Sequence, residues 1–443
     1  SLDIARAAAR KVILDIEALP AILTIDEALE KGALLYPPST LSRGDVATAM
    51  AVAPRRLKAE LRCGGQEHFY LEGQIAIATP TEDGDLVVQS STQHPTEVQH
   101  IVSRVLGLEY NQVTVMVRRM GGAFGGKESN ASWVGAVAGL LARRTNRPVK
   151  LRLPRGDDMV ATGKRHGFLF RYEIGFDDAG RVLALDAMLA ANGGHSVDLT
   201  PGVLGRALTH IDNAYWIPHL RAVGHPCKTN TVSNTAFRGF GGPQGVLPME
   251  DAILRIARAL GRTPEQVRAV NFYGEGRDDE TPYGQKVEDN RIRACIEQVT
   301  RESNWQARRA EIDAFNRQGG PLRRGLGMFP LKFGISFNVP SMNQAGALVH
   351  VYSDGSIRLN HGGTEMGQGL FVKVAQVVAE VFQVDLDRIR VTATSTGEVP
   401  NTSPTAASTG SDLNGWAAFE AASTIKARLT AFVAEQLAAA ASD

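Results

Sequence analysis

The sequence predicts an α+β protein, in which strands and helices are mixed along the chain. Segments with the alternating pattern of strands and segments with the spacing of amphipathic helices both occur, but they do not alternate strictly. A doubly wound parallel sheet is therefore disfavoured. No repeat of fixed period is visible, and the 443 residues, of which 43% are hydrophobic, suffice for about two or three domains.

Residues 1–36 are expected to be the end of a preceding small α/β domain and its linker. Val12–Ile16 has the composition of a short strand, and Thr24–Gly32 has the pattern of a short helix with Asp26 as its N-cap. The Pro37–Pro38 pair ends this segment. Because the chain begins with Ser rather than Met, we interpret it as a segment of a longer protein.

Residues 37–275 are expected to form the first large domain. Leu86–Ser91 has a strand pattern, and the helix that follows opens at Pro95. The strand Val113–Met120 leads through a glycine-rich segment into a second helix. The apolar face of that helix is predicted to contain Val134, Val137, Leu140 and Leu141. Phe168–Leu189 is predicted to be a hairpin.

Residues 276–443 are expected to comprise linker helices and the first part of a second large domain. The charged residues 287–317 have helical spacing. Ala347–Gly363 is predicted to be a hairpin that turns at Asp354–Gly355, and Leu370–Phe382 is predicted to be an apolar helix.

The charge and the cysteine content exclude several classes of function. The 48 Lys and Arg residues nearly balance the 47 Asp and Glu residues, which argues against a nucleic-acid partner and against a disordered chain. Three isolated cysteines do not suggest a disulfide framework or a thiolate metal site. No run of 18 apolar residues and no signal peptide is present, so we expect a cytoplasmic setting without a membrane partner.

Glycine is concentrated in three segments, which we call loop one (Met120–Lys127), loop two (Phe237–Gly245) and loop three (His361–Gly369). Loop one is close to a P-loop pattern, but Glu128 stands where that motif needs a hydroxyl group beside magnesium. Since a carboxylate there would repel phosphate, binding of a nucleoside triphosphate is not expected. Glycines that serve only tight turns would explain one such loop but not three.

We infer instead that backbone N–H groups of the three loops converge on one extended polar ligand. The helix N-termini after loops one and three are expected to favour an anionic group on that ligand. Polar side chains in or near these segments are those of Gln244, Gln368, Thr405 and Ser408. Because no Cys or His cluster could bind a metal directly, we expect any metal to be carried by an organic ligand, without protein metal ligands.

Seven strings of residues, in order along nearly the whole chain, resemble the molybdenum-cofactor-binding part of the xanthine dehydrogenase and xanthine oxidase family. They are Gly64–Glu72, Arg118–Glu128, Lys228–Gly245, Phe333–Phe337, Asn343–Gly355, His361–Gly369 and Pro400–Ser408. The resemblance implies a molybdopterin cofactor whose dithiolene holds molybdenum with oxo, sulfido and hydroxyl ligands. It also implies that 2Fe-2S clusters, FAD and NAD are bound by a partner subunit or region, in an assembly of two heterodimers.

The resemblance implies a hydroxylase that oxidises hypoxanthine to xanthine and xanthine to urate with oxygen from water, and that passes electrons to NAD. Glu128 and Arg206 match the residues that hold the purine, and Phe240 and Phe337 match those that sandwich it. Gln93 matches a residue that points its amide at a molybdenum oxygen, and we expect it, Glu128 and Arg206 to be catalytic. The residues that match the cofactor lining are Gln93, Phe124, Gly125, Arg238, Gln368, Thr405, Ala406, Ala407 and Ser408.

Two alternatives stay open. The first is an aldehyde or N-heterocycle hydroxylase of the same family, although its aldehyde oxidases typically carry apolar residues at the positions of Glu128 and Arg206. The second is a non-catalytic cofactor-binding segment, because the family's general base lies in a Gly-Glu-Pro-like motif that does not occur here. Glu365 is a poor substitute, since loop three faces the cofactor in the family. We therefore expect further segments of the molybdenum subunit to complete the site.

Overall fold

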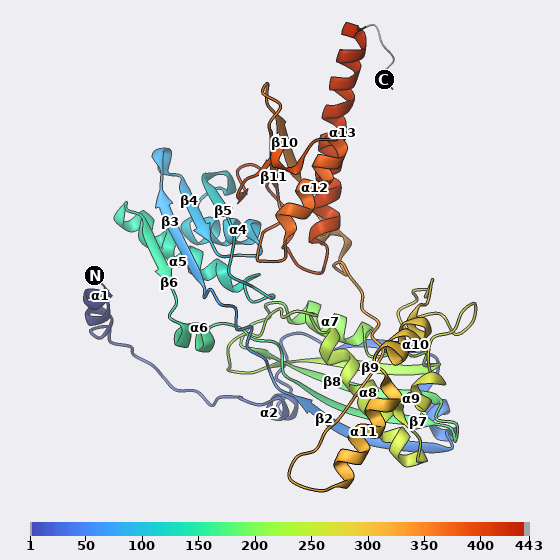
Figure 1. Ribbon diagram of the computed structural model, residues 1–443. Coiled ribbons are helices and arrows are strands. Elements are labelled where there is room, and N and C mark those ends of the chain that lie inside the picture. The colour runs from blue at the N-terminus through green and yellow to red at the C-terminus, as the bar shows by residue number, and fades with distance from the viewer. Residues whose placement is uncertain (1, 438–443) are drawn as a thin grey trace.

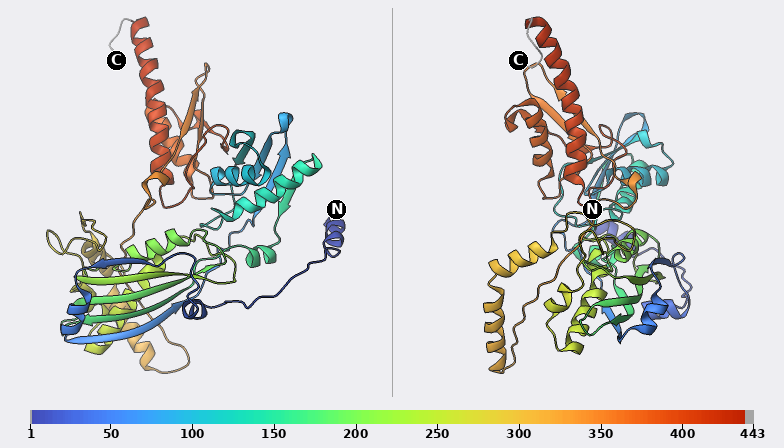
Figure 2. Two further views of the ribbon diagram at one scale, coloured as in Figure 1. Left: turned by 180° about the vertical axis from the view of Figure 1, so that it is seen from behind. Right: turned by 90° about the vertical axis from the view of Figure 1, so that its right-hand side faces the viewer.

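The computed structural model describes residues 2–437 and confirms the α+β class. Three sheets, each with its own helices, make up the body of the chain, and the first sheet lies on one side of the other two (Figure 1). The helix α1 (Leu2–Ala9) buries no residue and lies at the end of an extended segment, away from the three sheets (Figures 1 and 2). Among residues 2–437, no helix combines the length and the apolar character that a membrane crossing requires.

The first sheet has five strands and a large core on one face. Its order is β1 (Ser39–Arg43), β9 (His219–Lys228), β8 (Val182–Gly194), β7 (Phe168–Phe176) and β2 (Arg55–Cys63), and only β8 and β9 pair in parallel. Every second residue of β7, from Phe168 to Phe176, is buried in this core. The helices that cover this face are α7 (Thr200–Thr209), α8 (Gly242–Leu260) and α9 (Pro264–Ala269).

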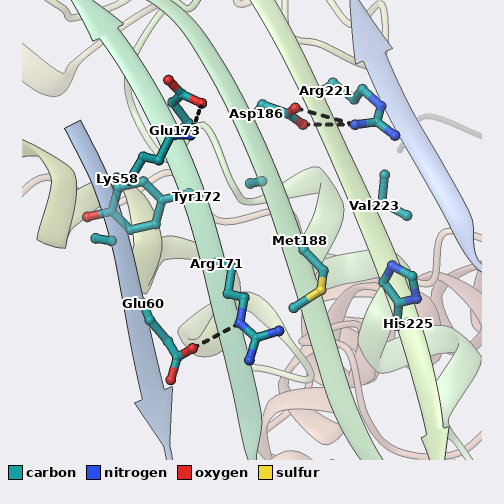
Figure 3. Close-up of a pocket in the computed structure, with 12 residues that line it drawn as sticks. Lys58, Glu60, Arg171, Tyr172, Glu173, Asp186, Met188, Arg221, Val223 and His225 are labelled. Carbon is teal, nitrogen blue, oxygen red and sulfur yellow. Dashed lines mark hydrogen bonds and ion pairs between the residues drawn. The ribbon is translucent and has the colours of Figure 1, made fainter. Parts of the chain in front are cut away.

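The opposite face of the first sheet is charged. Figure 3 shows a shallow pocket over it, where Lys58 pairs with Glu173 at 3.3 Å and Arg221 pairs with Asp186 at 3.1 Å. Ion pairs at such exposed positions contribute about 0–1 kcal/mol each. None of the predicted site residues lines this pocket, and we interpret this part of the face as a solvated surface. Another part is covered by Ala28, which packs with Leu169, Ala190 and Cys227.

The second sheet also has five strands, and two helices cover it. Its order is β13 (Thr394–Ser395), β5 (Val113–Val117), β4 (Leu86–Ser90), β3 (Ile75–Pro80) and β6 (Val149–Arg152). The helices are α4 (Pro95–Leu106) and α5 (Asn130–Thr145). The strand and the helix predicted from Leu86 and from Pro95 are thus confirmed. β13 belongs by sequence to the third unit, so this pairing fastens the third unit to the second sheet.

The predicted apolar face of α5 is confirmed for Val134, which is buried, and wrong for the other three residues. Val137, Leu140 and Leu141 are 40–45% exposed, whereas the buried face consists mainly of Ala and Gly. A Cβ at Gly135 would lie 3.0 Å from the Val98 side chain, which shows how closely α5 approaches α4. Small residues permit this approach, and a pattern search weighted toward large side chains selects the opposite face.

The third unit contains a three-stranded sheet packed on two helices. The hairpin of β10 (Ala347–Val351) and β11 (Ile357–His361) is confirmed, and β12 (Ile389–Val391) adds in parallel. The helix α12 (Leu370–Phe382) has the predicted bounds and packs with α13 (Gly410–Leu437). The linker helices are α10 (Ile292–Glu302) and α11 (Trp305–Arg317). The remaining short elements are α2 (Ile25–Glu30), α3 (Val46–Val52), α6 (Arg155–Ala161), η1 (Glu82–Gly84), η2 (Tyr110–Gln112), η3 (Pro340–Met342) and η4 (Leu386–Arg388).

Two expectations about the first 36 residues are wrong. Val12–Ile16 forms no strand, because it is exposed and has no neighbouring strand to pair with. The N-cap of α2 is Thr24 rather than Asp26: the Thr24 hydroxyl accepts the Glu27 N–H and the Glu27 carboxylate accepts the Thr24 N–H. Asp26 lies in the first turn, where its carboxylate binds Arg62 at 2.7 Å.

Candidate functional site

The three glycine-rich loops meet, as the sequence predicts. The Arg238 N–H of loop two donates to the Phe124 carbonyl of loop one at 2.9 Å. The Met120 N–H of loop one donates to the Glu365 carbonyl of loop three at 3.0 Å, and Met366 packs against the Met120 side chain. Loop one therefore lies between the other two, and the three sheets join at this point.

Loops one and two approach each other so closely that a side chain could not fit between them. Gly125 has a φ of +100°, and a Cβ on it would lie 2.8 Å from the Ala236 carbonyl carbon and oxygen. Such a position requires glycine. Gly125 thus serves the contact between the two loops, a role that the sequence could not distinguish from the predicted contact with a cofactor.

Gln93 connects loop one to the segment before α13. Its buried side-chain oxygen accepts the Gly125 N–H at 2.8 Å, and its amide nitrogen donates to the Thr405 carbonyl at 3.0 Å. The Thr405 N–H donates back to the Gln93 carbonyl at 2.9 Å. The amide keeps one N–H free for another partner, because each amide nitrogen carries two hydrogens.

The segment Thr405–Ser408 presents a row of free backbone donors. Among residues 2–437, no acceptor is found for the N–H groups of Ala406, Ala407 and Ser408. Ala407 and Ser408 have φ values of +53° and +59°, a conformation that non-glycine residues rarely adopt. Successive N–H groups in such a turn form a concave binding site for anionic or polar oxygen atoms.

The surroundings of this row fit a group such as molybdopterin, which brings its own metal. Phe124 and Ser408 are exposed at the loop junction, as are the side chains of Arg238 and Gln368. These groups supply N–H donors, a guanidinium and an aromatic surface. No group of three His, Cys, Asp or Glu side chains within residues 2–437 could hold a metal ion. The donor set therefore suits a polar organic ligand rather than a bare cation.

The expectation that the N-terminus of α12 is free for an anion is wrong. The Glu365 carboxylate accepts the N–H groups of Gly367, Gly369 and Phe371 at 2.9–3.0 Å, so the chain's own side chain occupies this helix end. Burial alone would raise the pKa of Glu365, but these N–H groups lower it below its usual value. The amide of Gln368 also bonds within loop three, to Thr364 and Met366.

Two other polar side chains of the loops have partners that do not face a ligand. The Lys127 ammonium is fully buried and donates to Ser91 at 2.8 Å, beside Glu72 at 3.4 Å and the Tyr70 ring. It therefore cannot cradle a phosphate, which agrees with the absence of a P-loop. Gln244 is buried in α8, where its amide donates weakly to the His166 carbonyl at 3.4 Å.

Glu128 lies directly before α5 and is buried, with 6% of its surface exposed. Burial is the main reason why its pKa rises to about 8, and the negative charges of Asp198 and Glu97 add to the rise. The carboxyl group is therefore mostly neutral at pH 7. A neutral carboxyl group can donate one hydrogen bond and accept others.

Arg206 lies in the last turn of α7 and is also buried. Its guanidinium donates to the Gly334 carbonyl and, at 2.6 Å, to the Ser336 carbonyl. Its Nε is buried and has no partner among the residues that the structure describes. Burial lowers the pKa of Arg206. Among the described residues no ion pair joins Arg206 to Glu128, so the two are not a surface salt bridge.

The two predicted phenylalanines have different surroundings. Phe240, with a φ of +48°, packs its ring against Gly202, where a Cβ would lie 2.7 Å from the ring. The backbone of Phe337 is held by both polar atoms of the Asn343 side chain at 3.0 Å. No ring contact between Phe240 and Phe337 occurs within residues 2–437, so the sandwich stays a prediction.

Two residues that the sequence analysis did not select also belong to this region. Phe333 lies under the Arg206 guanidinium at 5.5 Å and beside the His210 ring. Asp198 accepts three hydrogen bonds at the start of α7. Phe333 stands within one of the matching strings, and an Asp just before a helix that opens with Thr-Pro is a recognisable N-terminal signal.

Comparison with known families gives two matches that together cover most of the chain. Models of molybdopterin cofactor-binding domains match residues 30–272 and residues 298–443. The xanthine dehydrogenase/oxidase of Felis catus is 46% identical over 429 residues, which are 97% of this chain and 32% of that protein. Xanthine dehydrogenase 1 of Arabidopsis thaliana is 46% identical over 431 residues, 96% of this chain and 31% of that protein. The chain spans about a third of the length of these relatives.

Solved structures share the fold. Quinoline 2-oxidoreductase from Pseudomonas putida 86 superposes with a TM-score of 0.88 at 24% identity, covering all of this chain and 58% of that one. Aldehyde oxidoreductase from Desulfovibrio gigas superposes with a TM-score of 0.82 at 25% identity, covering 96% of this chain and 47% of that one.

Proposed function

Because the chain belongs to the molybdopterin cofactor-binding domain family, we propose that it forms the cofactor- and purine-binding part of a xanthine dehydrogenase. This enzyme oxidises hypoxanthine to xanthine and xanthine to urate, with oxygen derived from water. The observation that carries the proposal is the placement of Glu128 and Arg206. Both are buried beside the loop junction, although neither has the other as a salt-bridge partner. Buried, unneutralised polar groups of this kind are typical of binding sites.

The cofactor is proposed to lie at the loop junction. The free N–H groups of Ala406–Ser408, the Gln93 amide and the side chain of Arg238 would hold it. When bound, the cofactor supplies the metal that accepts electrons from the substrate. The three sheets meet at this point, so the residues around the cofactor are held by three packed cores rather than by one flexible loop.

The purine is proposed to lie between the loop junction and α7. The neutral Glu128 would donate to a ring nitrogen or carbonyl oxygen and accept from a ring N–H. Arg206 would stabilise negative charge that develops on the heterocycle, since its Nε has no partner among residues 2–437. Phe240 and Phe337 would hold the flat ring through aromatic contacts.

The electron-transfer centres and the general base are proposed to come from other parts of the protein or from a partner subunit. Two heterodimers would then carry 2Fe-2S clusters, FAD and the NAD site. The other candidate activity is hydroxylation of an aldehyde or another N-heterocycle. The assays of xanthine and benzaldehyde described below distinguish this alternative from the proposed activity.

Arg206→Met in the complete, cofactor-loaded enzyme tests the proposal. We expect kcat/KM for xanthine to fall by about 10²–10³-fold, because a group that stabilises developing charge is lost, while turnover of benzaldehyde is retained or rises. Steady-state assays of both substrates measure this. Arg221→Met, on the charged outer face in Figure 3, is the matched control and should leave both rates unchanged. Unchanged xanthine kinetics in Arg206→Met, or a wild-type enzyme that oxidises only benzaldehyde, would contradict the proposal.

A further inference from the structure

The carboxylate of Asp198 accepts hydrogen bonds from three segments of the chain, at Ser129, Leu199 and Thr235. Its Oδ2 accepts the Ser129 hydroxyl at 2.8 Å, and its Oδ1 accepts the Thr235 hydroxyl and the Leu199 N–H at 2.7 Å. The Ser129 and Thr235 hydroxyls are themselves 3.1 Å apart. Asp198 has a φ of +39°, which is unusual for a residue other than glycine. A closed set of hydrogen bonds therefore holds this turn in a strained conformation.

Each partner of Asp198 lies on a segment that carries a residue of the proposed purine site. Ser129 is the N-cap of α5 and directly follows Glu128. Leu199 is the N-cap of α7, the helix that carries Arg206. Thr235 stands just before loop two, which carries Phe240. One carboxylate thus fastens the three segments whose relative placement defines the site.

Asp198 also contributes to the charge around Glu128. The negative groups that act on Glu128 are Asp198, from the turn before α7, and Glu97, from α4. Glu97 lies 3.4 Å from His94, and burial lowers the pKa of His94 to about 4, so this imidazole is neutral at pH 7. Lys127, next to Glu128 in sequence, binds Ser91 and Glu72 instead. Among the described residues, the charges that act on Glu128 are therefore those of Asp198 and Glu97, and no positive group is among them.

We propose that Asp198 is a positioning residue for substrate recognition: its carboxylate fastens the segments that bear Glu128, Arg206 and Phe240, and its negative charge adds to the burial that keeps Glu128 in the neutral, hydrogen-bond-donating form. The inference rests on the proposed function and extends it. Asp198 acts through Glu128 and has no assigned contact with substrate or cofactor. Burial is the main reason why Glu128 can serve as a donor at neutral pH, and the neighbouring carboxylate strengthens the effect.

Asp198→Asn in the complete enzyme removes the charge and keeps the size of the side chain. The amide oxygen can still accept from Thr235 and Leu199, and the amide nitrogen can donate to the Ser129 oxygen in place of the bond that the carboxylate accepts. We expect the alkaline limb of the kcat/KM profile for xanthine to move to lower pH by about one unit, because Glu128 then ionises more easily. Asp186→Asn, on the outer face of the first sheet, should not move the profile. An unshifted limb in Asp198→Asn would overturn the charge part of the proposal.

Ser129→Ala tests the fastening, because it removes one hydrogen bond and leaves the Asp198 charge in place. We expect KM for xanthine to rise severalfold without a shift of the pH limb. An unchanged KM would overturn the fastening part. If Asp198→Asn does not fold, Ser129→Ala still tests the fastening part of the proposal.

An infrared titration provides a readout that needs no substrate. The band of the protonated Glu128 carboxyl is identified by its loss in Glu128→Gln, and its midpoint should be lower in Asp198→Asn than in the wild type. Equal midpoints would overturn the inference. A wild-type enzyme that oxidised benzaldehyde but not xanthine would end the proposed function, whereas the infrared midpoints would still decide the role of Asp198.

Discussion

Two glutamates lie close to the start of a helix, Glu128 directly after loop one and Glu365 within loop three. Their carboxyl groups have opposite surroundings. Glu365 accepts three backbone N–H groups at the start of α12, which lower its pKa. Glu128, before α5, is buried near Asp198 and Glu97, and its pKa rises to about 8. One glutamate is a charged cap and the other is a neutral polar group.

The difference shows that nearness to a helix N-terminus does not decide the charge of a carboxyl group. What decides it is how deeply the carboxyl group is buried, whether N–H groups point at its oxygens and whether other charges lie nearby. In loop three the carboxylate stabilises the loop itself. Directly after loop one the carboxyl group is proposed to face a ligand, and its burial has a cost in stability.

The largest expected effect compares a glycine of each loop. Gly125 and Gly367 have similar φ values of +100° and +104°, but a Cβ on Gly125 would press on Ala236, whereas a Cβ on Gly367 would meet nothing within 4 Å. We expect Gly125→Ala to destabilise the protein by about 2–4 kcal/mol and Gly367→Ala by about 1 kcal/mol. Denaturant unfolding of both variants measures this. Equal losses would show that backbone strain alone matters and that the contact between loops one and two does not.

A smaller loss is expected when the cap of loop three is removed. Glu365→Ala leaves three N–H groups without their acceptor, so we expect a loss of about 2–3 kcal/mol above pH 5. The Glu365 pKa is lowered by folding, so this contribution is present above the usual value of 4.5 and disappears as the pH falls through the folded value. Melting midpoints of the wild type and the variant at several pH values should converge under acidic conditions. A constant difference at all pH values would contradict the cap interpretation.

A third expected effect, on the Glu128 carboxyl group, has the opposite sign. In the unfolded chain Glu128 loses its proton above about pH 4.5, but in the folded chain it keeps the proton up to about pH 8, so its burial destabilises the fold increasingly as the pH rises between these values. We expect Glu128→Gln to be equally stable near pH 4.5 and increasingly more stable than the wild type toward pH 8, by up to about 1.4 kcal/mol for each unit of pH. The same melting series measures this. A Glu128→Gln variant that loses stability at pH 8, as Glu365→Ala does, would remove the contrast between the loops.

Much of the architecture could be predicted because it depends on local patterns. The bounds of α12, the helix that opens at Pro95 and the hairpins all follow from periodicity and turn residues. The meeting of the three loops was also predictable, since three glycine-rich segments are hard to explain separately. The strand expected at Val12–Ile16 was wrong because a strand needs a neighbour, which composition does not reveal.

The residues of the site stay a prediction, and their interactions could not be predicted from the sequence. The matching strings select Glu128, Arg206 and Gln93, but hydrogen-bond partners depend on segments far away in sequence. Arg206 binds carbonyl groups at 334 and 336, and Gln93 binds Thr405. Asp198 was missed for the same reason, because its importance lies in the segments that it joins.

The two-residue strand β13 has a consequence for how the protein is synthesised. Thr394 pairs with Val117 at the border of the second sheet, although β5 leaves the ribosome long before β13 does. Until then the backbone of β5 presents an unpaired edge, on which another chain could add by mistake. Nascent polypeptides halted before residue 394 should consequently aggregate more readily than those extended past it. The order of synthesis thus determines how long the edge of β5 stays unpaired.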